Sequence, residues 1–421
     1  MQINISGLFF SFIFFFAICN DITIVSNTIY EIVLSILTIF LLIILSFRFY
    51  LKKNIKPYFI WKYNKFIIAY FLCLYFLNLL YHPIDISTIF RLLAYTLVSI
   101  SVYIIIPYYL FINNVLREKF FKIILFFTMI LSITVLWPSV IGNSFFGIPI
   151  SLKTGYSFLG FYASGGIISH PLTAGTQIVI GIGLCIYLFK INHNYLYIIS
   201  IVFMLFVLML TQARGAVFAL FIGVLYYLLP NKISRSNIIM LVFIPIFIFL
   251  LFVFILPIIK NVDLLNLFLR LDGNILSYRG ILWVFGLDLI KNNPLVGYGF
   301  LQSSNELAHS GLLDTIPTLS AGAPFHSTFI DNAVDSGLLS IFIYSMLFIT
   351  PIIRARKYWP EKTQAKLIVA ICYGILISAI FINYNIGGVR SVSITIAILL
   401  GLANWSILTK HKMLHLINSK P

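Results

Sequence analysis

Long apolar runs, each close to the length that spans a bilayer, restrict the fold class of this sequence more than any other feature. They lie near residues 5–24, 29–47, 65–81, 88–113, 120–140, 171–189, 195–211, 214–229, 238–259, 327–350, 366–384 and 390–409. A transmembrane helix needs about 20 such residues. Charged residues make up only 10% of the chain, against about 25% in soluble domains. The sequence therefore predicts an all-α polytopic integral membrane protein with about twelve transmembrane helices.

The longest interruption of this pattern is a polar segment between the ninth and tenth runs. It divides the chain into transmembrane helices one to nine (1–259), a large outward loop with short helices (260–326), and helices ten to twelve with a short tail (327–421). Within the loop, one amphipathic helix is predicted to begin at Arg279 and to end at the Asn292-Asn293-Pro294 break. A second outward loop, 141–169, precedes Pro171, which suits the first turn of a helix.

The distribution of basic residues predicts which side of the membrane each loop faces. Of the 28 Lys and Arg residues, 20 fall in the loops after every even-numbered helix and in the C-terminal tail. Because Lys and Arg accumulate on cytoplasmic loops, both termini are predicted to be cytoplasmic and the loop 260–326 to lie on the opposite side. In a bacterium this places the protein in the inner membrane with its large loop in the periplasm. The net charge of +16 then reflects topology and anionic lipids rather than a nucleic-acid partner.

Three arginines on the predicted outward side are candidates for binding an anionic substrate. Arg214 follows Thr211 and Gln212 between two apolar runs, Arg279 opens the predicted loop helix, and Arg390 opens the last run. The guanidinium group binds phosphate oxygens in a bidentate manner. The ordinary alternative for each is a charge that snorkels to the interface or is solvated.

His326, just before the tenth run, is the candidate acid–base group, because imidazole titrates near neutral pH. A helix cap is its ordinary alternative. Asp331 and Asp335 follow, one turn apart on one helical face, and acidic groups near a membrane helix are often functional. Helical geometry puts Asp335 roughly opposite His326, so the pattern does not predict a dyad. The scattered His, Asp, Glu and Cys residues predict no metal site and no cofactor.

Taken in order, these motifs resemble the O-antigen ligase/polymerase superfamily of bacterial envelope enzymes. The resemblance rests on Thr211-Gln-Ala-Arg214-Gly, on Arg279-x-x-x-Trp283 followed by Asn293-Pro294-Leu-x-Gly297-x-Gly299, and on His326 followed by Asp335-Ser-Gly337. Arg390-Ser391 resembles the C-terminal segment of that family. The chain departs from the family at Ser327, where Asn is usual, and at Asp335, where Glu is frequent.

The resemblance implies glycosyl transfer at the periplasmic face, from a glycan on undecaprenyl diphosphate, without a metal. Arg214, Arg279 and His326 would be the catalytic residues, and Gln212, Asp335 and Arg390 would contact substrate. The acceptor would be lipid A–core sugar in a ligase, which the motifs favour, or a second lipid-linked repeat unit in a polysaccharide polymerase. A transporter for the same lipid-linked glycan is a third alternative, although the chain shows no internal repeat of the kind common in transporters.

Overall fold

The computed structural model describes residues 5–21, 28–53, 62–81, 86–158, 161–168, 171–228, 279–310, 325–359, 362–380, 386 and 388–409. Its helices are α1 (Ile5–Asp21), α2 (Thr28–Lys53), α4 (Lys65–Tyr81), α5 (Ile86–Ser99), η2 (Ile100–Ile105), α6 (Ile106–Ile112), α7 (Asn114–Val140), α8 (Pro171–Asn192), α9 (Leu196–Thr211), α10 (Arg214–Leu228), α13 (Arg279–Asn292), α14 (Ser303–His309), α16 (Thr328–Tyr358), α17 (Lys362–Ser378) and α18 (Ser391–Trp405). The predicted ninth transmembrane helix, 238–259, lies outside the described residues.

Five of the described helical stretches are long and apolar enough to cross a membrane: Ile32–Phe49, Thr88–Ile112, Asn114–Val140, Pro171–Asn192 and Thr328–Tyr358. Six further apolar helices are shorter, and each coincides with a predicted run. The chain is thus nearly all-helical, with the architecture of a polytopic membrane protein. The predicted start at Pro171 and the predicted loop helix from Arg279 to Asn292 are both confirmed.

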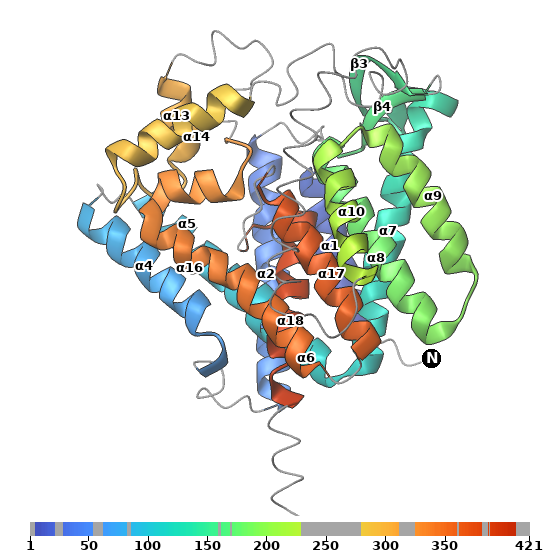
Figure 1. The fold of residues 1–421 in the computed structure, drawn as a ribbon, viewed down its shortest axis with the longest axis horizontal. Coiled ribbons are helices and arrows are strands. Elements are labelled where there is room, and N and C mark those ends of the chain that lie inside the picture. Colours follow the sequence, from blue (N-terminus) through green and yellow to red (C-terminus); the bar gives the residue numbers. More distant parts are fainter. Residues whose placement is uncertain are drawn as a thin grey trace, which may run out of the picture.

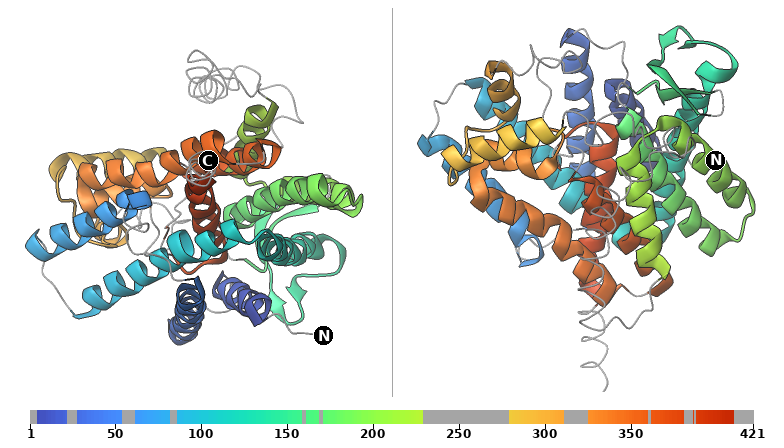
Figure 2. Two further views of the ribbon diagram at one scale, coloured as in Figure 1. Left: turned by 90° about the horizontal axis from the view of Figure 1, so that it is seen from below. Right: turned by 45° about the horizontal axis from the view of Figure 1, so that its top comes forward.

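Helix α18 lies at the centre of the bundle, and the other helices surround it (Figure 2). Every one of its residues is buried, which fits its apolar sequence. Gly401 allows the closest approach, because a Cβ atom there would meet the backbone of Tyr103 and the ring of Pro107. At this contact the predicted helix 88–113 is interrupted by the π-helix η2. Pro107 has no N–H to donate to the carbonyl of Tyr103, which explains why regular α-helical bonding fails there.

The predicted second outward loop, 141–169, contains β-structure, which the all-α prediction did not include. Strands β1 (Ser144–Phe145) and β2 (Ile148–Pro149) form one antiparallel pair, and β3 (Ser151–Phe158) and β4 (Phe161–Gly166) form another. Phe146 and Gly147 connect the first pair with φ angles of 48° and 80°. Positive φ at both central residues matches the right-handed twist of a hairpin, and a Gly favours such a turn.

Helix α16 covers the predicted tenth run, 327–350, from Thr328 onward, but it is not regular throughout. Gly337 has φ 74° and ψ 177°, so the helix is kinked after its first turns. The short N-terminal part packs under α13 and α14, and the long part descends through the bundle (Figure 1). Helices α13 and α14 and the short N-terminal part of α16 together form a unit that we call the cap. The cap has its own apolar core, formed by Leu282, Leu289, Ile290, Leu307, Phe325, Ala333 and Val334.

Candidate functional site

Arg214 begins α10 after a tight turn from α9. Gln212, between the two helices, adopts a left-handed conformation with φ 49°, and its carbonyl accepts a hydrogen bond from the Arg214 N–H at 3.1 Å. The turn packs against Gly175 of α8, where a Cβ atom would lie 2.6 Å from that of Ala213. The close approach of small residues thus fixes the backbone that carries Arg214, whose side chain is half-buried.

Helix α17 connects this turn with the start of α16. Helices α10 and α17 run antiparallel, since Gly223 faces the carbonyl of Ala370 and Gly374 faces that of Ala219. The same register brings Arg214 to the level of Ala379, just beyond the end of α17. The Ala379 carbonyl accepts a hydrogen bond from the Thr328 N–H at 2.9 Å. The start of α10 and the start of α16 therefore lie at the same end of the bundle.

Helix α13 approaches the same point from the loop. Trp283 lies one turn after Arg279, and its indole Nε1–H donates to the carbonyl of Phe325 at 3.1 Å. The Phe325 ring is fully buried, with its centroid 6.1 Å from that of Phe285. The parts of the chain that carry Arg214, Arg279 and His326, separated by 65 and 47 residues of sequence, are thus connected by contacts around residues 325–328.

His326 occupies an unusual backbone conformation between Phe325 and the helix. Its φ is 55°, in the left-handed region that non-glycine residues seldom adopt. Ser327 is the N-cap of α16, and its hydroxyl accepts from the Ile330 N–H at 3.5 Å. Ser327, and not His326, therefore caps α16. His326 lies just before this N-cap residue, with a half-buried imidazole and a strained backbone.

Asp335 has a clear structural role. The carboxylate is buried, and its Oδ1 accepts from the Ser303 N–H at 2.7 Å. The backbone N–H groups of Leu301 and Gln302 and the Ser303 hydroxyl lie around the same carboxylate. Asp335 therefore holds the start of α14 against α16. A contact between Asp335 and substrate stays a prediction.

The glycine motifs at 297–299 and 337 allow the backbone of the loop to pack directly against the backbone of α16, a contact that we call the interlock. The N–H groups of Tyr298 and Gly299 donate to the carbonyls of Val334 and Asp335 at 2.8 and 2.9 Å. A Cβ atom on Gly297 would lie 2.5 Å from the Val334 carbonyl oxygen, and one on Gly337 would overlap the backbone of Leu295. Only glycine permits this approach. The motif thus docks the loop onto the kink of α16.

Arg390, the N-cap of α18, lies beside the end of α1. Its Nε is 3.9 Å from Oδ1 of Asp21, while 62% of the arginine side chain is exposed. The buried Asp21 carboxylate also accepts from the N–H of Ser391 at 3.0 Å and from its hydroxyl at 2.5 Å. Asp21 therefore fixes the start of α18, and much of the Arg390 side chain stays open to solvent.

A buried polar network beneath the cap was not predicted from the sequence. The Tyr70 hydroxyl donates to Asn332 Oδ1 at 2.7 Å, and the Phe300 N–H donates to Asn78 Oδ1 at 2.8 Å. Both bonds link α4 to the cap, across more than 200 residues of sequence. Single Tyr and Asn residues within apolar runs were the available signal, because polar side chains in a membrane helix usually face a partner.

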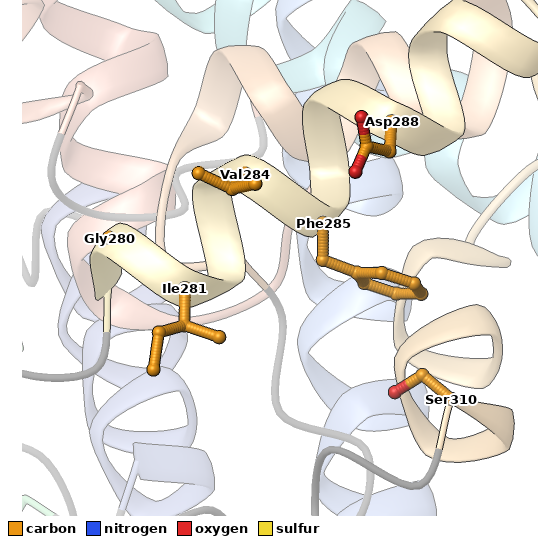
Figure 3. A pocket seen from close by; sticks show the side chains of 6 residues that line it. All are labelled: Gly280, Ile281, Val284, Phe285, Asp288 and Ser310. Carbon is orange, nitrogen blue, oxygen red and sulfur yellow. The ribbon is translucent and has the colours of Figure 1, made fainter.

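The outer face of α13 borders an open groove of about 460 Å³ (Figure 3). The groove is lined by Gly280, Ile281, Val284, Phe285, Asp288 and Ser310. It is mainly apolar, and its first lining residue directly follows Arg279. Within the part of the chain that the structure describes, no group of three His, Cys, Asp or Glu side chains is arranged to hold a metal ion.

Comparison with protein families identifies the segment that contains this arrangement. Residues 199–345 match the family described as O-antigen ligase. The match covers about a third of the chain. The family segment contains Arg214, Arg279 and His326, together with the interlock and Asp335, so the resemblance predicted from the motifs is confirmed. No curated protein matches the chain. This similarity, together with the long apolar helices, supports an integral membrane protein with an enzymatic function of the ligase/polymerase type.

Proposed function

We propose that this chain is an O-antigen ligase, which transfers a glycan from undecaprenyl diphosphate to a sugar of lipid A–core. The observation that supports this best is the convergence of the starts of α10, α13 and α16 around residues 325–328. Two arginines and a histidine begin or precede these three helices. Such a set matches the chemistry of a donor whose leaving group is a diphosphate.

In this proposal Arg214 and Arg279 bind the diphosphate. Cleavage of the sugar–phosphate bond leaves negative charge on the diphosphate oxygens, and preorganised cations stabilise that charge in the transition state. His326 orients the acceptor hydroxyl and takes its proton as the new glycosidic bond forms. Gln212, Arg390 and Asp335 are proposed as further substrate contacts. The arginines would supply the charge that a metal provides in other transferases.

We further propose that the chain crosses the bacterial inner membrane about twelve times, with both termini cytoplasmic and the site in the periplasm. The positions of charged residues at the two ends of α16 support this orientation. The half-buried Arg354 of α16 donates to the Tyr63 carbonyl and to Asn404 Oδ1, far along α16 from His326. Arg356 and Lys357 lie at the same end. The basic clusters and the candidate site thus occupy opposite ends of α16, as the positive-inside rule requires.

A polysaccharide polymerase is the second candidate, because the motifs resemble a superfamily that includes both ligases and polymerases. It would use the same donor and the same arginines, and it would differ only in its acceptor, a second lipid-linked repeat unit. The test is transfer by the purified full-length protein, given undecaprenyl-diphosphate glycan and lipid A–core together. Glycan on lipid A–core supports the ligase, and longer lipid-linked chains would replace it by the polymerase. Transfer to neither acceptor by folded protein would contradict both and favour a transporter.

A further inference from the structure

Asp331 carries a buried carboxylate beside the candidate site that the mechanism above does not use. Its side chain is only 2% exposed. Oδ1 accepts a hydrogen bond from the Phe325 N–H at 2.8 Å, and the Ser327 N–H lies near the same carboxylate. Oδ2 is buried and has no hydrogen-bond partner among the described residues. Burying an unpaired carboxylate oxygen is costly, so its retention calls for a reason.

The Asp331 carboxylate contacts the residues on both sides of His326. The N–H of Phe325 is held by Asp331, and the carbonyl of Phe325 is held by Trp283 of α13. The next residue, His326, then takes its left-handed φ of 55°. A non-glycine residue keeps such a conformation only where its surroundings hold it. Asp331 provides one polar contact that can do so.

Helix capping does not account for Asp331. Ser327 already caps α16 through the Ile330 N–H. Asp331 instead reaches back past the cap to Phe325, which precedes the helix. The other buried acid of α16, Asp335, binds a different segment, at Ser303. The two backbone groups that the Asp331 carboxylate contacts, at Phe325 and Ser327, therefore flank His326.

We propose that Asp331 is a positioning residue, which fixes the backbone of residues 325–327 so that the His326 imidazole faces the reacting groups. The inference rests on the proposed role of His326 in glycan transfer. It predicts that an oxygen acceptor at position 331 is required, since the acceptor holds the Phe325 N–H. A negative charge is not required, so Asn is sufficient.

Three variants of the full-length protein test this. Asp331→Ala should lower kcat by about 10²-fold, the effect of a small misplacement of a catalytic group, with the KM for the donor unchanged. Asp331→Asn keeps an acceptor and should retain most turnover. Asn332→Ala is the matched control, because Asn332 is also buried in the first turns of α16 but bonds Tyr70 and the Thr328 carbonyl. At equal amounts of folded protein, it should keep the wild-type kcat.

A second readout does not depend on activity. In protein labelled with ¹⁵N-histidine, the His326 resonance is assigned by its loss in His326→Gln. It should move in Asp331→Ala and stay in place in Asn332→Ala. Wild-type turnover in Asp331→Ala, an unmoved His326 resonance, or an equal shift in Asn332→Ala would each overturn the inference. If the wild-type protein transfers no glycan, the proposed function fails, while the histidine spectrum still decides whether Asp331 positions His326.

Discussion

The indole of Trp283 and the carbonyl of Phe325 are joined by a hydrogen bond of 3.1 Å. This bond connects the helix that begins at Arg279 with the residue that precedes His326. The Thr328 N–H, two residues after His326, bonds the Ala379 carbonyl at the level of Arg214. Two bonds near a single short segment therefore bring three distant parts of the sequence to one end of the bundle.

Trp283→Phe should lower turnover by up to about 10²-fold, because α13 then loses its bond to the segment that carries His326. The loss of one hydrogen bond should cost about 1 kcal/mol of stability. Trp137→Phe is the matched control, since the Trp137 indole also donates to a carbonyl, that of Ser144, but on the β1–β2 hairpin. Turnover and melting temperature are measured in detergent. Equal effects of the two variants on turnover would contradict the proposed link.

Arg214→Ala, Arg279→Ala and His326→Ala should each reduce glycan transfer by about 10²-fold or more, since each removes a group that stabilises or activates the reacting atoms. The amount of each protein in the membrane should not change. Arg91→Ala, an exposed arginine of α5, is the arginine control. His193→Ala is the histidine control, because His193 also has a left-handed φ, of 50°, but lies in the turn between α8 and α9. Full activity of all three site variants would rule out the proposed site.

Arg279→Lys should also be impaired, although it keeps the charge. A lysine ammonium is a point charge, and it lacks the planar fork that binds two phosphate oxygens at once. The expected defect is a loss of kcat/KM for the diphosphate-linked donor, measured against Arg91→Lys. A lysine variant with wild-type kcat/KM would show that charge alone suffices at this position.

Gly297→Asn should destabilise the protein by about 1–3 kcal/mol, the usual cost of overpacking, and should also abolish transfer. The Cβ atom would come within 2.5 Å of the Val334 carbonyl oxygen, so the loop could not dock onto α16. Gly147→Asn is the control, because its φ of 80° is close to the 68° of Gly297, and no atom lies within 4 Å of the new Cβ position. Asn tolerates left-handed φ better than most residues. The thermal stability of the two variants is compared. Because both variants place Asn at a positive φ, a difference in stability reports the steric clash at position 297. Equal stability would contradict the interlock.

Glycan transfer should continue at an unchanged rate in the presence of EDTA, because the proposed site neutralises the diphosphate with arginines. The assay uses purified protein with the chelator added before the donor. A loss of transfer that Mg²⁺ or Mn²⁺ restores would show that a cation shares this role.

The sequence by itself determined the class of fold and the candidate residues. Apolar runs of bilayer length predict membrane helices because the hydrocarbon core leaves the backbone few other ways to satisfy its hydrogen bonds. The helix from Arg279 to Asn292 and the start at Pro171 could be predicted because they depend on local signals, a polar break and a proline. The order of the Arg214, Arg279 and His326 motifs was sufficient to indicate the family of residues 199–345.

Only the tertiary structure decided what holds these residues together. The kink at Gly337, the contact of Gly297 with Val334 and the bonds from Asp331 and Asp335 join segments whose pairing no local pattern encodes. The physical reason is that a glycine motif or a buried acid reveals that a close approach or a hydrogen bond is needed, but it does not reveal the partner. The partner depends on how the helices pack, and that packing places the carboxylate of Asp331 on the backbone beside His326.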